Sequence, residues 1–447
     1  MRPLSCSRAY PQRGLITVKS AFMLTALLGI AACAFDIGWI AMTRTQLQAA
    51  ADASALAGAT ELLPGLGPKP SRTATQTTSF VGTQAVTYAS LHRNGEAETT
   101  YANATRDVVL GRAYWDTQSG KYLKQVGATP YNMVQVTLLR DQDGSSNNDK
   151  PLSLLIAPVI GKTKARMSVR ATAIVMPAGG VRIPATSTLN ANLMPFAVRD
   201  TEWQKYLRAQ THFANVLGGN KALINSTYID GVTGTPLYYH YEPGNGNGNG
   251  NSKKTTVVLA QSYFDNYAYS SSTGRVTSGS DGILEIDIYP NTKVTSSGNT
   301  VPGNFGTIDL GSPSNGTPDL RRQIETGLGA QDLAYYPDNQ ISISAATPFT
   351  TGGDTGISAG IQSSLEAVVG LDRAITLFDQ LTGTGNNSSY RLVEIVGTRV
   401  MASSFQGSTT NKYLYVQVNT MRLNGSTPAT SPPDSSKTVY TPLILIE

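Results

Sequence analysis

The chain has 447 residues, of which 40% are hydrophobic and 15% are charged, and its formal net charge is +5. The first nineteen residues contain four basic and no acidic side chains, which leaves 31 of the 35 basic residues against all 30 acidic ones in the rest. The body is therefore nearly neutral, and this excludes the basic footprint of a nucleic-acid-binding protein.

The first sixty residues predict one long helix. Residues 1–19 are a basic head, residues 20–42 are apolar apart from Asp36, and an alanine-rich stretch continues without a helix breaker to Pro64. A helix over residues 20–42 is about 35 Å long, enough to cross a bilayer core. We therefore predict a transmembrane helix at 20–42 with the basic head in the cytoplasm. Asp36 and Trp39 are expected at the outer membrane boundary.

Small residues line one face of this helix beyond the predicted membrane span. Ala50, Ser54 and Gly58 recur every four residues and so lie on one side of the helix. Small side chains at this spacing let a second helix approach closely, and we expect packing against a helix of a partner protein. The alternative is an alanine-rich helix packed on its own domain.

The same segment carries a family resemblance. It begins Arg13-Gly14, has Asp-Ile-Gly at 36–38 and ends in LQAAADASALAGA at 47–59. These motifs resemble the amino-terminal segment of TadG-like proteins of Flp/Tad pilus assembly. The resemblance implies an envelope-anchored assembly component whose partners are other pilus-assembly or envelope proteins. Four later blocks also resemble TadG-like proteins, without implying any chemistry: NFGTIDLG, DLRRQIETGL, GDTGISAGIQSSLEAVVG and GNNSSYRLVEIVGTRV.

Two processing signals provide alternatives for the amino-terminal segment. Cleavage after Gly14, as in prepilins, would favour a polymerising fibre subunit, but Lys19 stands where such processing expects glutamate. Residues 30–33 resemble a lipobox that ends at Cys33, but the chain stays apolar beyond this cysteine. We predict an uncleaved anchor.

The body is predicted to contain two domains. Alternating apolar residues at 131–139 and 165–175 indicate strands that complete a TadG-like amino-terminal domain of residues 43–180. Residues 184–447 form a β-rich domain with a flexible Gly/Asn-rich loop at 244–252. Its strands are expected at 282–290, 341–349, 390–400 and 412–418, and its helices at 318–328 and 360–371. The fold class is α+β, with a long transmembrane, pilin-like helix before a β-rich extracytoplasmic body.

Motifs for catalysis are incomplete. Residues 356–360 match the G-x-S-x-G of a nucleophile elbow, but all three histidines precede Ser358, whereas an α/β-hydrolase has its histidine after the serine. Both cysteines precede residue 34, so the body has no thiolate zinc site. We predict no catalytic residues, no cofactor and no enzyme.

One acidic loop is a candidate metal site. Its oxygen-bearing side chains stand at alternate positions, a pattern that suits calcium. They are Asp141, Asp143, Ser145, Asn147 and Asp149. The alternative is a solvated loop after the 131–139 strand.

These features together predict a non-catalytic, membrane-anchored component of Flp/Tad-type pilus assembly that links the pilus to the envelope. It is expected to be single-pass, with a cytoplasmic amino terminus and a periplasmic or extracellular body. Two alternatives remain open. One is a surface adhesin that binds glycan or matrix through residues 184–447, and the other is a polymerising, pilin-like fibre subunit.

Overall fold

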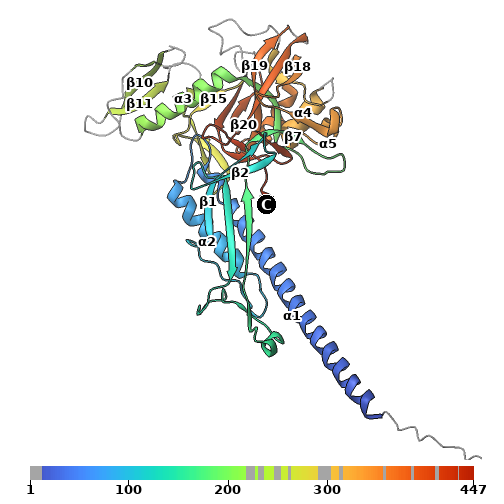
Figure 1. Cartoon of the computed structure of the whole chain (residues 1–447). Helices are drawn as coiled ribbons and strands as arrows, with labels where there is room; N and C mark the ends of the chain where they lie inside the picture. Colours follow the sequence, from blue (N-terminus) through green and yellow to red (C-terminus); the bar gives the residue numbers. More distant parts are fainter. Residues whose placement is uncertain are drawn as a thin grey trace, which may run out of the picture.

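The computed structural model describes most of the chain. A long amino-terminal helix leads into a small domain of one helix and one sheet, and a larger β-rich domain follows (Figure 1). The described residues are 13–217, 227–229, 236–245, 253–259, 263–289, 304–311, 316–355, 359–383, 387–407, 412–430 and 432–446.

Helix α1 runs without interruption from Arg13 to Thr60 and contains 48 residues. It ends just before a short 3-10 turn, η1 (Leu63–Gly65), in which Pro64 lacks the N–H that another helical turn needs. The predicted single helix that stops before Pro64 is therefore confirmed. Within the part of the chain that the structure describes, no helix combines the length and hydropathy required to span a membrane, so the span predicted at 20–42 is not confirmed.

Helix α2 (Ala74–Ser90) packs alongside the carboxyl-terminal part of α1 (Figure 1). Its first turn is closed by a capping box, in which the Thr73 side chain accepts from the Gln76 N–H and the Gln76 side chain accepts from the Thr73 N–H. The Thr-x-x-Gln spacing could have revealed this helix in the sequence.

The small domain is built on a five-stranded antiparallel sheet with the order β2-β1-β3-β6-β25. The strands predicted at 131–139 and 165–175 are confirmed as β3 and β6. Strand β25, at one edge of this sheet, comes from residues 444–446. These residues were predicted to belong to the second domain, but they pair with β6 of the first. The bounds are β1 Val108–Asp116, β2 Lys121–Val126, β3 Met133–Arg140, β6 Met167–Ile174 and β25 Ile444–Ile446.

The large domain is built on an eight-stranded sheet with the order β12-β15-β21-β20-β18-β16-β8-β19. Strand β19 pairs again with β20, so five strands close into a ring. The only parallel pair in the order is β8 with β19, among the described pairings of this sheet. The bounds are β8 Leu193–Arg199, β12 Tyr263–Phe264, β15 Glu285–Asp287, β16 Asn304–Ile308, β18 Phe349–Thr355, β19 Asp372–Thr382, β20 Ser389–Ser404 and β21 Tyr413–Val418.

Smaller elements surround these sheets. The helices are α3 Asp200–Leu217, α4 Thr317–Thr326, α5 Ala330–Leu333 and α6 Gln362–Ala367, and the 3-10 turns are η2 Ala157–Ile160, η5 Pro337–Asn339 and η6 Ala359–Ile361. The short strands are β4 Leu152–Ser153, β5 Lys164–Ala165, β7 Ala178–Arg182, β9 Thr227–Ile229, β10 Pro236–Asn245, β11 Lys253–Leu259, β13 Tyr267–Ser270, β14 Arg275–Ser278, β17 Gln340–Ser342, β22 Met421–Arg422, β23 Ser426–Pro428 and β24 Val439–Tyr440.

The predicted elements of the large domain have mixed outcomes. The strands at 282–290, 390–400 and 412–418 and the helix at 318–328 are confirmed as β15, β20, β21 and α4. The single strand at 341–349 is wrong, because Ser344 and Thr347 exchange backbone hydrogen bonds in a turn that separates β17 from β18. The helix at 360–371 is shorter than predicted. Of the predicted loop at 244–252, residues 244–245 end β10, and the remainder lies outside the described residues.

The two domains meet at the carboxyl end of α1. The Arg422 guanidinium donates to the carbonyl oxygens of Ala59 and Thr60, at 3.2 and 3.0 Å, where the helix leaves carbonyls without helical partners. Lys69 donates through Nζ to the Gly282 carbonyl at 2.7 Å. With β25 in the small sheet, these contacts tie the large domain to the base of the helix.

Candidate functional site

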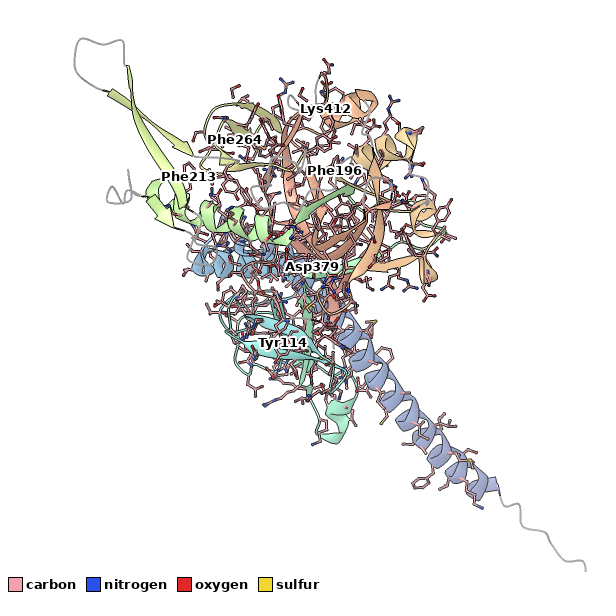
Figure 2. The ribbon with its side chains drawn as sticks, turned by 90° about the horizontal axis from the view of Figure 1, so that it is seen from above. Tyr114, Phe196, Phe213, Phe264, Asp379 and Lys412 are labelled. Carbon is pink, nitrogen blue, oxygen red and sulfur yellow. The ribbon has the colours of Figure 1, made fainter. Side chains whose placement is uncertain are left out.

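Helix α1 divides into two parts that differ in their surroundings. Residues 43–60, here called the packed half, lie against the small domain. Residues 13–35, here called the projecting half, extend beyond the sheets of both domains (Figures 1 and 2). Every side chain that the structure describes from Thr17 to Phe35 is exposed. We therefore treat α1 and what touches it as the candidate site.

The projecting half exposes large apolar side chains on all its sides. Phe22 is 75% exposed and Leu27 is 64% exposed. The exposed apolar residues are Val18, Phe22, Met23, Leu24, Leu27, Ile30 and Phe35. Because contiguous apolar surface of this kind is rare on soluble monomers, it indicates contact with lipid or with another protein.

The small-residue face lies inside the packed half. Ala50 and Ser54 are fully buried, and the Ser54 hydroxyl donates to the Ala50 carbonyl at 2.7 Å. A side chain on Gly58 would meet the Cγ1 atoms of Val81 in α2 and Val134 in β3, both at 3.2 Å. The face is thus covered by this chain's own helix and sheet, which is the alternative that the sequence left open. Its small side chains bring α2 and the sheet close to α1.

Asp36 joins the two halves of the helix to a distant loop. Its carboxylate accepts the backbone N–H groups of Leu155 at 2.9 Å, Ile156 at 3.1 Å and Ala157 at 2.6 Å. Only 4% of Asp36 is exposed, and Trp39, one turn further on, is half-buried. The structure therefore satisfies the carboxylate with backbone donors 119 or more residues away in sequence.

The loop that Asp36 holds is a hairpin of residues 152–165, here called the apolar hairpin. Strand β4 pairs with β5 at its base, and η2 forms its tip. The buried Leu152 fixes this base to the domain, but Leu155 is 60% exposed and Val159 is 86% exposed at the tip. The sequence shows these residues as the apolar run SLLIAPVIG. It does not reveal that this run contacts Asp36, so its position in the fold could not be predicted.

A groove of about 540 Å³ separates the apolar hairpin from α1. The helix lines one wall with residues between Thr25 and Ile40, and the hairpin lines the other with Leu154, Ile156, Ala157, Val159 and Lys162. Figure 1 shows this tip beside the helix, below the small sheet, and Figure 2 shows the same neighbourhood from above. The groove reaches well into the projecting half.

The candidate calcium loop does not converge on one point. Asp149 accepts from the Arg106 guanidinium at 2.9 Å and from Ser145 Oγ at 2.5 Å, whereas Asp143 pairs with Arg166. Asp141 accepts from Gln142, and the N–H of Asn147 donates to Ser145. Across the described residues, no group of three or more His, Cys, Asp or Glu side chains could hold a metal ion. Arginines pair with two of the three carboxylates that calcium would need, those of Asp143 and Asp149.

A second acidic cluster lies in the large domain, near the base of α1. Glu285 is fully buried and accepts the Asn266 N–H and the Gln417 side-chain amide, both at 2.8 Å. Burial, with Asp265 and Asp281 nearby, raises the pKa of Glu285 to about 7. Burial also lowers the pKa of Lys69, which comes from the loop after α1. We therefore expect the stability of the large domain to depend on pH.

The G-x-S-x-G motif at 356–360 lies largely outside the described residues. Ser358 lies outside the described residues. Among the described histidines, His92 is half-buried just after α2, and burial lowers the pKa of His212 in α3.

Comparison with known proteins assigns the amino-terminal part of the chain. Residues 14–61 match the family model described as putative Flp pilus-assembly TadE/G-like. This segment is similar to the TadE/G-like family. The resemblance predicted from residues 13–62 is thereby confirmed, and the match connects the chain with Flp pilus assembly. No curated protein and no solved structure matches the chain.

The TadE/G-like segment coincides with α1. The family match begins one residue after the helix and extends one residue beyond it. The motif thus covers the projecting half, Asp36 and the whole small-residue face. The candidate site and the family segment are the same element of the structure.

Proposed function

We propose that the chain is a non-catalytic, membrane-anchored component of Flp/Tad-type pilus assembly. The projecting half of α1 is the anchor, and the two domains form the part that works outside the membrane. The basic head of residues 1–19 supports an amino terminus in the cytoplasm and a body in the periplasm or outside the cell, because positive charges favour the cytoplasmic side. In this position the protein links the pilus to the envelope, and other pilus-assembly proteins are its partners.

The exposed apolar surface of the projecting half carries this proposal. Burying one large aliphatic or aromatic side chain is worth about 1.5–3 kcal/mol, and several such side chains stand in solvent here. The body leaves them uncovered, although it covers the packed half of the same helix completely enough to bury its alanines. Lipid supplies the missing apolar surroundings.

The anchor is tested by placing charge in it. Leu24→Arg combined with Leu27→Arg adds two guanidinium groups, each of which costs about 2.5–3.5 kcal/mol at the centre of an inserted helix. We expect the variant to leave the membrane fraction after an alkaline carbonate wash. Leu123→Arg on β2, also at an exposed leucine, is the matched control and stays with the membrane. Retention of the double variant would refute the anchor.

The assembly role needs a separate measurement. A strain without this chain is expected to lose surface pili, and complementation with the full chain is expected to restore them. Complementation with the Leu24→Arg, Leu27→Arg variant should fail. Normal piliation in the strain without the chain would remove the assembly role and favour the adhesin alternative.

The fibre-subunit alternative differs in the mature amino terminus. Mass spectrometry of the chain from membranes is expected to find Met1. A terminus at Leu15 would instead indicate prepilin processing, and a lipidated Cys33 would indicate a lipoprotein.

A further inference from the structure

We propose that the apolar hairpin is a second lipid-contacting element, which enters the outer interface of the membrane beside α1. This inference rests on the proposed membrane anchor and extends it to a part of the chain outside the TadE/G-like segment. Its partner is the surface of a bilayer that contains anionic phospholipid.

The first observation is where the hairpin places its apolar side chains. Leu155 and Val159 point to solvent at its tip, while Leu152 at its base is fully buried in the small domain. The change from buried to exposed occurs within one short loop. A loop that served only to connect β4 with β5 would carry polar residues at its tip, because exposed loop tips normally do.

The second observation is that the tip is held in place. Leu154 donates its N–H to Thr163 at 3.0 Å across the hairpin, and Lys162 donates its N–H to Ala157 at 3.1 Å. Gly161 closes the 3-10 turn with a φ of 78°, a left-handed conformation that favours glycine. Asp36 then clamps three successive amides of the loop onto α1. The apolar tip therefore has a fixed position relative to the helix.

The third observation is the depth of the hairpin along the helix. The groove between them runs from Ile40 back to Thr25, a rise of about 22 Å along α1. Because the hairpin lies beside the projecting half, a membrane that surrounds this half also contacts the hairpin. Asp36 does not prevent this, because its charge is already satisfied by the three amides.

The fourth observation is the charge that follows the tip. Lys162 and Lys164 are exposed, and they come directly after the apolar run, with Arg166 two residues further on. In this arrangement the apolar tip can contact the acyl chains of the lipids, and the lysines that follow it can contact the lipid phosphate groups. This order of apolar and basic residues favours a lipid surface over an apolar helix of another protein.

Depth-dependent quenching tests the inference on the full chain. In a Cys6→Ser, Cys33→Ser background, a single cysteine at Val159 is labelled with an environment-sensitive fluorophore. Val126→Cys on β2 is the control, because Val126 is also strongly exposed but belongs to the outer strand of the sheet. Leu24→Cys reports on the anchor. The chains are reconstituted into vesicles of phosphatidylcholine and phosphatidylglycerol that carry spin-labelled lipid.

We expect shallow spin labels to quench position 159 several times more than position 126, and deep spin labels to quench position 24. Quenching at 24 without quenching at 159 would overturn the inference and leave the anchor standing. Quenching at neither position would overturn both. Lys162→Gln with Lys164→Gln should reduce quenching at 159 when phosphatidylglycerol is present. An unchanged signal in this variant would overturn the role of anionic headgroups.

Discussion

The two halves of α1 share one continuous backbone but differ in the size of their apolar side chains. The packed half uses alanine, with Ala50, Ala51, Ala55 and Ala59 all fully buried, while the projecting half uses Phe22, Met23, Leu24 and Leu27 in exposed positions. Small side chains let a neighbouring helix and sheet approach, and large ones offer more area to a fluid surrounding. The comparison teaches that side-chain size separates a helix face made for close protein packing from one that the protein leaves uncovered.

The largest expected effect comes from removing a large side chain in the packed half. Leu47 is fully buried, so Leu47→Ala should lower the free energy of unfolding by about 2–5 kcal/mol through lost apolar burial and a cavity. Leu27→Ala, at an exposed position, should change it by less than about 0.5 kcal/mol. Urea denaturation of the full chain in detergent measures both. Equal losses would break the comparison.

Adding a large side chain should also destabilise the packed half more than an uncovered position of the helix. Gly58→Leu introduces atoms where Val81 and Val134 already lie 3.2 Å from an added Cβ, and overpacking should cost about 1–3 kcal/mol. Gly38→Leu meets nothing within 4 Å and should leave the stability unchanged or slightly raised, since leucine favours helix more than glycine does. The same denaturation experiment applies. A tolerated Gly58→Leu would mean that α2 and the sheet can move apart.

Removal of the Asp36 carboxylate should loosen the apolar hairpin without affecting the rest of the small domain. Asp36→Ala leaves three amides of the apolar hairpin without their acceptor, and we expect faster hydrogen exchange at Leu155, Ile156 and Ala157. Asp116→Ala removes a similar carboxylate that accepts from Gln118 and Ser119 in the β1–β2 turn, and it should affect only that turn. Slow exchange at 155–157 in Asp36→Ala would show that the hairpin is held by other contacts.

The expected effect that lies farthest from α1 is a pH dependence of the large domain. Because burial raises the pKa of Glu285 from 4.5 to about 7, the folded chain keeps a proton that the unfolded chain releases between these values. Stability should therefore fall as pH rises from about 4.5 to 7. Glu285→Gln should lessen this fall and be more stable than the natural chain at pH 8. Denaturation midpoints at pH 4 and pH 8 check this, and identical pH profiles would contradict it.

Much of the fold could be predicted where the signal is local. The absence of a breaker between residues 20 and 63 determines α1, and alternation determines β3 and β6, because backbone geometry and side-chain period are properties of neighbouring residues. Helix α2 is not predicted from the sequence, because its Ser/Thr-rich sequence has little apolar periodicity. The sequence predicts one strand in place of β17 and β18 because the turn at 344–347 contains no glycine, and Pro348 comes only after it.

The candidate site could be predicted only in part. Asp36, Trp39 and the small-residue face were found from their positions in the helix, but their partners could not be. The apolar hairpin lies more than a hundred residues away in sequence, and nothing near Asp36 indicates it. Likewise the acidic loop has ligand spacing for calcium, but Arg106 and Arg166, which lie outside the loop, pair with two of its carboxylates.

By itself, the sequence determined that one helix runs from the basic head to Pro64, that its apolar residues change from large to small along its length, and that a TadE/G-like motif occupies it. Only the tertiary structure decided which half is covered. It placed α2 and the sheet over Ala50, Ser54 and Gly58, brought β25 from the far end of the chain into that sheet, and set the hairpin against Asp36. The reason is that helix formation depends on residues within a few turns, whereas burial depends on surfaces that distant segments bring together.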